Sequence, residues 1–189
     1  MGKLVVSQFI TVDGVTEDPG GAEQFERGGW AFQFERGADG DAFKMDEVMA
    51  AEVLLLGRVT YEGFAAAWPS REGEFADKFN TMRKVVVSSS LRDPSWDNTT
   101  VVSDDVAGSV ERLKQETGGD ILVNGSMQLV GTLAEHNLVD EYRLMVFPVV
   151  LGAGRRLFGE LSSARPLELA ESRPAGETTI QIYRPKATA

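Results

Sequence analysis

The chain has 189 residues, a length typical of a single domain. Acidic residues outnumber basic residues 29 to 19, giving a formal net charge of −10, and a surface of this sign repels nucleic acid and anionic membranes. Cysteine is absent and histidine occurs once, which excludes disulfides, thiolate nucleophiles and cysteine-based metal sites, so we expect no metal centre.

The first predicted element is a strand over Leu4–Val12, a run rich in β-branched and aromatic residues that closes on the turn Asp13-Gly14. The next segment, residues 17–41, is crowded with glycine and acidic residues but contains large aromatic side chains. A long loop that contains several large aromatic side chains is more often part of a functional site than a simple connection between elements.

Three aromatic residues of this loop, Trp30, Phe32 and Phe34, alternate as one face of a small hairpin would. Two interpretations follow from that pattern. The aromatic face packs onto the sheet, or it lines a substrate pocket, with Trp30 as the candidate.

Three short apolar runs follow, and each ends in small polar residues, as strands buried on both faces of a parallel sheet do. Helical patterns separate them. The runs are Val53–Leu56, Lys84–Val87 and Asp120–Val123, and the helices are predicted near 43–51, 60–67, 72–81, 106–115 and 127–135.

The end of the chain has a different pattern. Val139–Val150 predicts a long strand, and Leu167–Glu171 with Thr178–Tyr183 predicts an antiparallel closing hairpin. The sequence therefore predicts a three-layer α/β/α domain over residues 1–185, with a mixed, mostly parallel sheet, and a frayed end at 186–189. No apolar stretch approaches the roughly 18 residues of a membrane span, so we expect a cytoplasmic protein with no membrane partner.

Ligands of open α/β sheets bind at the carboxyl ends of the strands, and candidate residues gather there. Gly57-Arg58-Val59-Thr60 opens a helix, Ser88-Ser89-Ser90 follows one strand, and Asn124-Gly125-Ser126 follows another. Each has an ordinary alternative: a turn glycine, a surface arginine, loop serines, or a helix N-cap at Ser126. None matches the G-x-G-x-x-G fingerprint, which disfavours a Rossmann domain.

The order of these motifs over nearly the whole chain resembles the dihydrofolate-reductase-like family, and within it the C-terminal reductase domain of the riboflavin-biosynthesis deaminase-reductase. The resemblance rests on Thr11–Gly14, Leu55–Glu62, Lys84–Ser89, Val123–Ser126, Leu138–Tyr142, Pro148–Gly154 and Leu157-Phe158. The deaminase reaction needs a zinc site built from histidine and cysteine. A chain without cysteine is therefore expected to lack deaminase activity.

The resemblance implies an NADPH-dependent reductase that transfers a hydride to a small heterocycle, either pterin-like or of the 5-amino-6-(5-phosphoribosylamino)uracil type. Arg58 would read the 2′-phosphate. The other implied cofactor contacts are Gly14, Gly57, Thr60, Ser88, Ser89, Gly125, Ser126 and Met127, and Asp13, Gly152 and Gly154 would border the substrate.

Dihydrofolate reductases place a carboxylate beside the pterin, and the charge pair Asp46-Glu47 lies on the corresponding helix. Asp46 is the candidate catalytic residue, with a solvated helix face as the alternative. The resemblance also implies a homodimer that associates through the sheet. A nucleotide-binding or sensing module that kept the fold and lost turnover is the alternative function.

Overall fold

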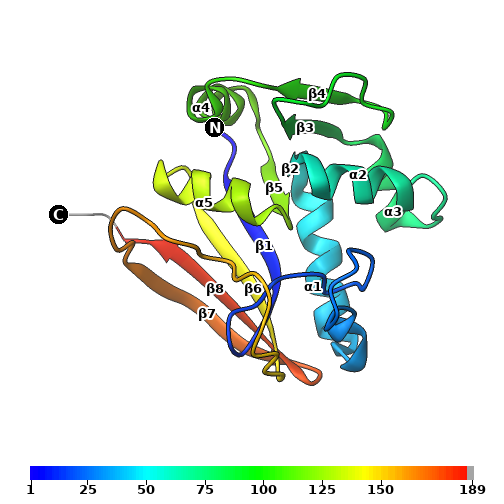
Figure 1. The fold of residues 1–189 in the computed structure, drawn as a ribbon, viewed down its shortest axis with the longest axis vertical. Helices are drawn as coiled ribbons and strands as arrows, with labels where there is room; N and C mark the ends of the chain where they lie inside the picture. Colours follow the sequence, from blue (N-terminus) through cyan, green and yellow to red (C-terminus); the bar gives the residue numbers. More distant parts are fainter. Residues whose placement is uncertain (187–189) are drawn as a thin grey trace.

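The structure, a computed structural model that describes residues 1–186, is built on one eight-stranded sheet with the order β4-β3-β2-β5-β1-β6-β8-β7 (Figure 1). The strands are β1 (Leu4–Thr11), β2 (Ala51–Gly57), β3 (Arg83–Val87), β4 (Thr99–Val102), β5 (Asp120–Asn124), β6 (Glu141–Phe147), β7 (Leu167–Ala175) and β8 (Thr178–Pro185). The helices are η1 (Trp30–Gln33), α1 (Gly37–Ala50), α2 (Arg58–Ala67), α3 (Glu74–Thr81), α4 (Val106–Glu116) and α5 (Met127–Glu135).

The sheet is parallel from β4 to β6 and antiparallel at β8 and β7. β1 lies in the middle and pairs with β5 on one side and β6 on the other. Parallel strands are buried on both faces, which explains why β2 and β5 read as continuous apolar runs. The predicted mixed sheet with an antiparallel C-terminal hairpin is confirmed.

Helices cover both faces of the sheet, as a three-layer α/β/α domain requires. α4 and α5 pack against one face through Val110, Leu113 and Leu133. On the other face α1, α2 and α3 contribute Val48, Tyr61 and Phe79 to a second core cluster. A third cluster, which includes Trp30 and Phe147, covers the carboxyl end of β6.

Three local predictions were wrong. β4 was not predicted, because its four residues carry two threonines and pair only with β3. The hairpin predicted from Trp30, Phe32 and Phe34 is instead the 3-10 helix η1. α1 begins at Gly37, inside the segment predicted as loop, because the buried Gly40 packs against the sheet despite its low helix propensity.

Two hydrogen bonds join the tip of the β7–β8 hairpin to the segment that precedes α1. Glu177 N–H donates to the Glu35 carbonyl at 2.7 Å, and Glu35 N–H donates to the Glu177 carboxylate at 2.8 Å. Gly176 has φ 57°, and a Cβ there would lie 2.3 Å from the Glu35 oxygen. Only glycine therefore fits at the tip of this hairpin.

Lys84 lies in the interior of β3 and is fully buried. Its Nζ donates to the carbonyls of Asn80, Met82 and Asp97 at 2.8, 2.9 and 3.0 Å and lies 4.3 Å from the centroid of the Trp96 ring. The ammonium of Lys84 thus supplies hydrogen-bond donors to the carbonyl groups at the end of α3 and in the loop that leads to β4.

At the C-terminal end, Lys186 N–H still donates to the Pro166 carbonyl at 2.9 Å. Residues 187–189, the rest of the predicted frayed end, lie outside the described part of the chain. Within residues 1–186, none of the helices has the length and apolar character needed to cross a bilayer.

Candidate functional site

Two strand-to-helix turns are joined at the carboxyl edge of the sheet. β2 and β5 are neighbours, so the turn after each strand lies at the same edge. Gly57 N–H donates to Ser126 Oγ at 2.8 Å, and Ser126 N–H donates to Thr60 Oγ1 at 3.0 Å. The structure therefore links the turn of Gly57 and Thr60 directly to the turn of Ser126, where the sequence predicted only that the two turns lie at the same edge.

The β5–α5 turn has an unusual backbone. Gly125 and Ser126 are both left-handed, with φ of 60° and 59°. A left-handed non-glycine residue costs roughly 1–3 kcal/mol, so the surrounding hydrogen bonds must hold Ser126 in place. A Cβ on Gly125 would lie 3.0 Å from Thr60 Cγ2 and 3.1 Å from Thr60 Oγ1.

The N-terminus of α5 has no side-chain cap. Ser126 occupies the N-cap position, but its Oγ accepts from Gly57 instead of from its own helix. The first N–H groups of α5, beginning at Met127, therefore lack a capping side chain, and the helix dipole favours an anion there. This turn can hold a phosphate group.

The third predicted turn, after β3, lies beside these two, since Gly57 and Val87 are register partners. Ser88 is buried, and its Oγ accepts from the N–H groups of Ser90 and Leu91 at 3.1 and 2.9 Å. Ser89 is exposed. Ser88 thus shapes the turn, while Ser89 is free to contact a ligand.

Arg58 opens α2 at this same edge. Its side chain is 43% exposed and forms an ion pair with Glu62 at 2.9 Å, one helical turn along. Exposed i,i+4 pairs contribute only about 0.3–0.5 kcal/mol, so a phosphate can compete with Glu62 for the guanidinium.

The opposite rim joins the end of β1 to the loop after β6. Asp13 Oδ2 accepts from Gly152 N–H at 2.8 Å, and Asp13 Oδ1 accepts from Thr11 Oγ1 at 2.6 Å. The hydrogen bond from Thr11 holds the pKa of Asp13 below its ordinary value, reinforced by the amides of Gly152 and Leu151. Asp13 therefore joins the turn after β1 to the loop after β6 through hydrogen bonds.

Glycines let these two loops approach closely. Gly14 and Gly154 have φ of 83° and 110°, and a Cβ on Gly154 would lie 2.7 Å from Val15 Cγ1. Val15 and Arg156 form an isolated bridge between the loops. Gly14, Gly152 and Gly154, predicted at the substrate, thus share one rim with Asp13.

Trp30 packs down onto the sheet. It is 1% exposed, its indole N–H donates to the Glu17 carbonyl at 2.9 Å, and its ring meets Phe147 edge-to-face at 5.3 Å. Of the two interpretations of the aromatic loop, packing is the one that the structure supports for Trp30. Phe32, on the same 3-10 helix, is 82% exposed.

The two carboxylates of α1 differ in their surroundings. Asp46 is exposed, whereas Glu47 is 2% exposed and faces β1. Glu47 Oε2 accepts from Ser7 Oγ at 2.9 Å and from Lys44 Nζ at 2.5 Å. Helical periodicity counted forward from the apolar Phe43 places Glu47 on the same side of α1, since residues four apart share a helix face.

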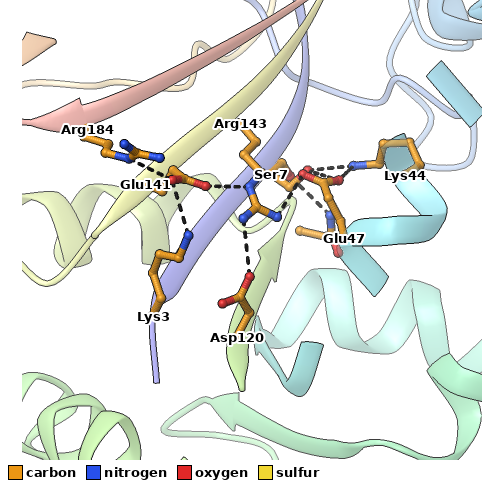
Figure 2. A network of polar contacts seen from close by, with 9 residues as sticks. Lys3, Ser7, Lys44, Glu47, Asp120, Glu141, Arg143 and Arg184 are labelled. Carbon is orange, nitrogen blue, oxygen red and sulfur yellow. Dashed lines mark hydrogen bonds and ion pairs between the residues drawn. The ribbon is translucent and has the colours of Figure 1, made fainter. Parts of the chain in front are cut away.

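Glu47 belongs to a network of charged groups on the α1 face of the sheet (Figure 2). Arg143 lies at its centre, 2.7 Å from Glu141, 3.3 Å from Asp120 and 3.9 Å from Glu47. Burial raises the pKa of Glu141, but the hydrogen bonds from Arg143 and Arg184 outweigh it, so the pKa is lowered overall. Glu47 Oε1 is buried and has no hydrogen-bond partner.

These groups do not form a metal site. Across residues 1–186, no cluster of three or more histidine, aspartate or glutamate side chains could hold a metal ion. The polar groups of the two cross-linked turns are instead backbone N–H groups and hydroxyls, the donor set that suits phosphate oxygens.

Solved structures resemble the whole fold. A putative riboflavin biosynthesis protein from Shewanella sp. PV-4 superposes with a TM-score of 0.79 at 19% identity, covering 97% of this chain and 99% of that one. Dihydrofolate reductase from Enterococcus faecalis, solved with NADP(H), superposes with a TM-score of 0.59 at 13% identity and covers 98% and 97%. The predicted dihydrofolate-reductase-like fold is confirmed.

Sequence comparison also identifies related proteins and a matching family. The uncharacterized protein YwjB of Bacillus subtilis (strain 168) is 26% identical over 185 residues, which is 98% of each chain. Residues 2–181 match the family described as the RibD C-terminal domain. That match extends from before β1 into β8, so it includes every turn described above. The chain therefore belongs to the RibD C-terminal domain family.

Proposed function

We propose that the protein is an NADPH-dependent reductase that transfers a hydride to a small heterocycle, pterin-like or ribosylaminopyrimidine-like. The observation that supports this most is the pair of cross-linked turns, in which Gly57, Thr60 and Ser126 bring the uncapped start of α5 to the carboxyl edge. This donor set suits the pyrophosphate of a dinucleotide. When bound, NADPH would supply the hydride.

Each side chain has a role in this proposal. Gly57, Thr60, Gly125, Ser126 and Met127 would surround the pyrophosphate, with Gly14 facing the nicotinamide. Arg58 and Ser89 would take the 2′-phosphate, and Ser88 would hold the turn that presents Ser89. The rim formed by Asp13, Gly152 and Gly154 would border the substrate, and Trp30 would support it from beneath. The protein's own contribution is to position the reactants and exclude water.

Titration with NADPH, followed by a heterocycle screen that monitors loss of the reduced cofactor's absorbance, tests the proposal. We expect tight NADPH binding and turnover with at least one pteridine or pyrimidine. NADPH binding without turnover on any of them would favour the sensing module, and absence of NADPH binding would contradict both functions.

Arg58→Ala is expected to weaken NADPH binding by about 1.5–3 kcal/mol, the range for hydrogen bonds to a charged group, and to affect NADH much less. The reason is that only NADPH has the 2′-phosphate. Isothermal titration with both cofactors measures the difference. Arg112→Ala, which removes an exposed arginine on α4, is the matched control. Equal losses for the two cofactors would show that Arg58 does not read the 2′-phosphate.

We also propose that two chains associate through the sheet. β7 is an edge strand with mostly exposed side chains, among them Leu169 at 55% exposure, and an open edge strand is a template for pairing. Light scattering at micromolar concentration is expected to give twice the chain mass of 20.6 kDa. A monomer mass would contradict the proposal.

A further inference from the structure

Asp18 is a buried acidic residue at the start of residues 18–29, a segment between β1 and η1 that we call the Asp18 loop. Asp18 is 2% exposed, and its φ of 48° lies in the left-handed region. A non-glycine residue is uncommon there and persists only where the surrounding contacts hold it. Burial of a carboxylate is also costly unless hydrogen bonds compensate it, so the partners of Asp18 indicate its role.

Four hydrogen bonds converge on Asp18 and fold the loop that follows it. Asp18 Oδ1 accepts from Glu23 N–H at 3.0 Å, and Oδ2 accepts from Phe25 N–H at 3.2 Å. The Asp18 carbonyl accepts from the N–H groups of Gly21 and Gly29 at 3.2 and 2.9 Å. Asp18 therefore holds the middle of the loop through its side chain and the end of the loop through its backbone.

Gly28 leaves the space that this carboxylate occupies. A Cβ on Gly28 would overlap Asp18 Oδ2 and would lie 3.1 Å from the Phe25 carbonyl oxygen. The φ of Gly28 lies outside the left-handed region, so this overlap, rather than backbone strain, opposes an alanine there. Gly28→Ala therefore displaces the Asp18 carboxylate without changing its chemistry.

The Asp18 loop packs against the loop that follows β6. The Phe25 ring would lie 3.0 Å from a Cβ on Gly154, and Arg27 Nη1 would lie 3.6 Å from a Cβ on Gly152. Arg27 also donates a hydrogen bond to the Leu151 carbonyl. Because Gly152 and Gly154 belong to the rim that is proposed to border the substrate, the Asp18 loop supports that rim.

We propose that Asp18 is a positioning residue for substrate binding. Its carboxylate holds the Asp18 loop, the loop holds Gly152 and Gly154 in place, and the heterocycle binds against the rim that these glycines form. This inference rests on the proposed reductase function and adds a residue that acts without touching the substrate. The cofactor phosphates are assigned to the turns of Gly57 and Ser126, whose hydrogen bonds to each other do not involve the Asp18 loop. Loss of the carboxylate should therefore weaken substrate binding and spare NADPH binding.

Asp18→Asn and Gly28→Ala both test the carboxylate. Asparagine keeps the shape of the side chain but has one acceptor oxygen, so its NH2 group would face one of the two backbone N–H groups. Glu52→Ala is the matched control. Glu52 Oε2 also accepts from two backbone N–H groups, those of Gly118 and Gly119 at 3.0 and 2.8 Å, but it lies at the amino end of β2.

The titrated ligands are 6-methylpterin and 5,6-diaminouracil, which represent the two proposed substrate classes. Each is titrated calorimetrically into wild-type protein saturated with NADP⁺, which cannot donate a hydride, and the tighter ligand is then used for the variants. The apparent affinity falls with the fraction of molecules in which the rim is formed, so we expect Asp18→Asn and Gly28→Ala to bind about 10- to 100-fold more weakly. NADPH affinity should be unchanged in both, and Glu52→Ala should match the wild-type protein for both ligands.

Cleavage by trypsin after Arg27 reports on the Asp18 loop itself. Arg27 is exposed, but its guanidinium is bonded to the Leu151 carbonyl and its backbone lies within the folded loop. Release of the loop is expected to raise the rate of cleavage at Arg27 at least about 10-fold in Asp18→Asn and Gly28→Ala, because proteolysis follows local opening. Cleavage after Arg71, between α2 and α3, is the internal reference.

Faster cleavage at Arg27 with unchanged affinity for the heterocycle would overturn the positioning role of Asp18. Weaker binding with unchanged cleavage would overturn the route through the loop, and an equal loss of affinity in Glu52→Ala would show general destabilisation instead. The wild-type protein is titrated first. Failure to bind NADPH, or to bind either heterocycle, would contradict the proposed reductase function, whereas normal wild-type binding with any of the three results above would overturn the Asp18 inference alone.

Discussion

Lys84→Met is expected to lower the free energy of unfolding by about 3 kcal/mol or more. Methionine fills a similar volume but leaves the carbonyls of Asn80, Met82 and Asp97 without the donor that they share. An unsatisfied buried acceptor costs about 1–3 kcal/mol, and the cation–π contact with Trp96 is lost as well. Urea unfolding measures the change.

Lys78→Met, a substitution on the less buried side of α3, is the control and is expected to cost under about 1 kcal/mol. Similar losses for the two variants would contradict a special role for the buried ammonium. A loss confined to Lys84→Met would show that the three carbonyls need their donor.

Lys84 also predicts a pH dependence. Desolvation lowers its pKa from 10.5 to about 8. Between about pH 8 and 10.5 the folded protein has lost this proton while the unfolded chain still holds it, so the unfolded state binds more protons. The contribution of Lys84 to the free energy of unfolding therefore rises with pH across that window, by up to about 3 kcal/mol.

Subtracting the pH profile of Lys84→Met from that of the wild-type protein isolates this contribution, since all other groups titrate in both. A difference that falls between pH 8 and 10.5 would contradict the lowered pKa. A flat difference would show that the three carbonyls and the Trp96 ring offset the cost of burial.

Gly125→Val is expected to weaken NADPH binding by at least about 100-fold. At φ 60° a β-branched residue is strained, and its Cβ would lie 3.0 Å from Thr60 Cγ2. Because Thr60 Oγ1 accepts from Ser126 N–H, displacing Thr60 opens the cross-link between the two turns. NADPH titration and thermal unfolding without ligand are measured together.

Gly73→Val separates backbone strain from loss of the site. Gly73 precedes α3 with φ 101°, and a Cβ there would meet nothing within 4 Å. It should lower the melting temperature yet bind NADPH normally. A folded Gly125→Val variant with unchanged NADPH affinity would place the pyrophosphate elsewhere.

The sequence predicted the elements whose apolar residues are contiguous. β2, β3 and β5 are buried runs, and their ends in glycine and serine marked the carboxyl edge correctly. β4 was not predicted because its strand conformation depends on pairing with β3. The start of α1 at Gly37 was not predicted because tertiary packing outweighs the low helix propensity of Gly37 and Gly40.

The site was predictable only in part. Adjacent turns can be inferred from parallel strands, but the bond from Gly57 to Ser126 joins residues 69 positions apart, and no local pattern reveals it. Likewise, Lys3 and Glu141 are 138 residues apart. The sequence did not show that Glu47 is buried whereas its neighbour Asp46, the candidate catalytic residue, is exposed, because the burial of α1 depends on its packing against the sheet.

The central position of β1 has a consequence for biosynthesis. β1 leaves the ribosome before both of its neighbours, β5 and β6, and Ser7 pairs with Asn124, 117 residues later in the chain. At roughly 5–20 residues per second, β1 waits on the order of ten seconds for either neighbour. Until then the backbone N–H and C=O groups of β1 have no partner strand. Such non-local pairing slows folding and leaves the apolar side chains of β1 exposed for longer in the nascent chain than in a chain that refolds at full length.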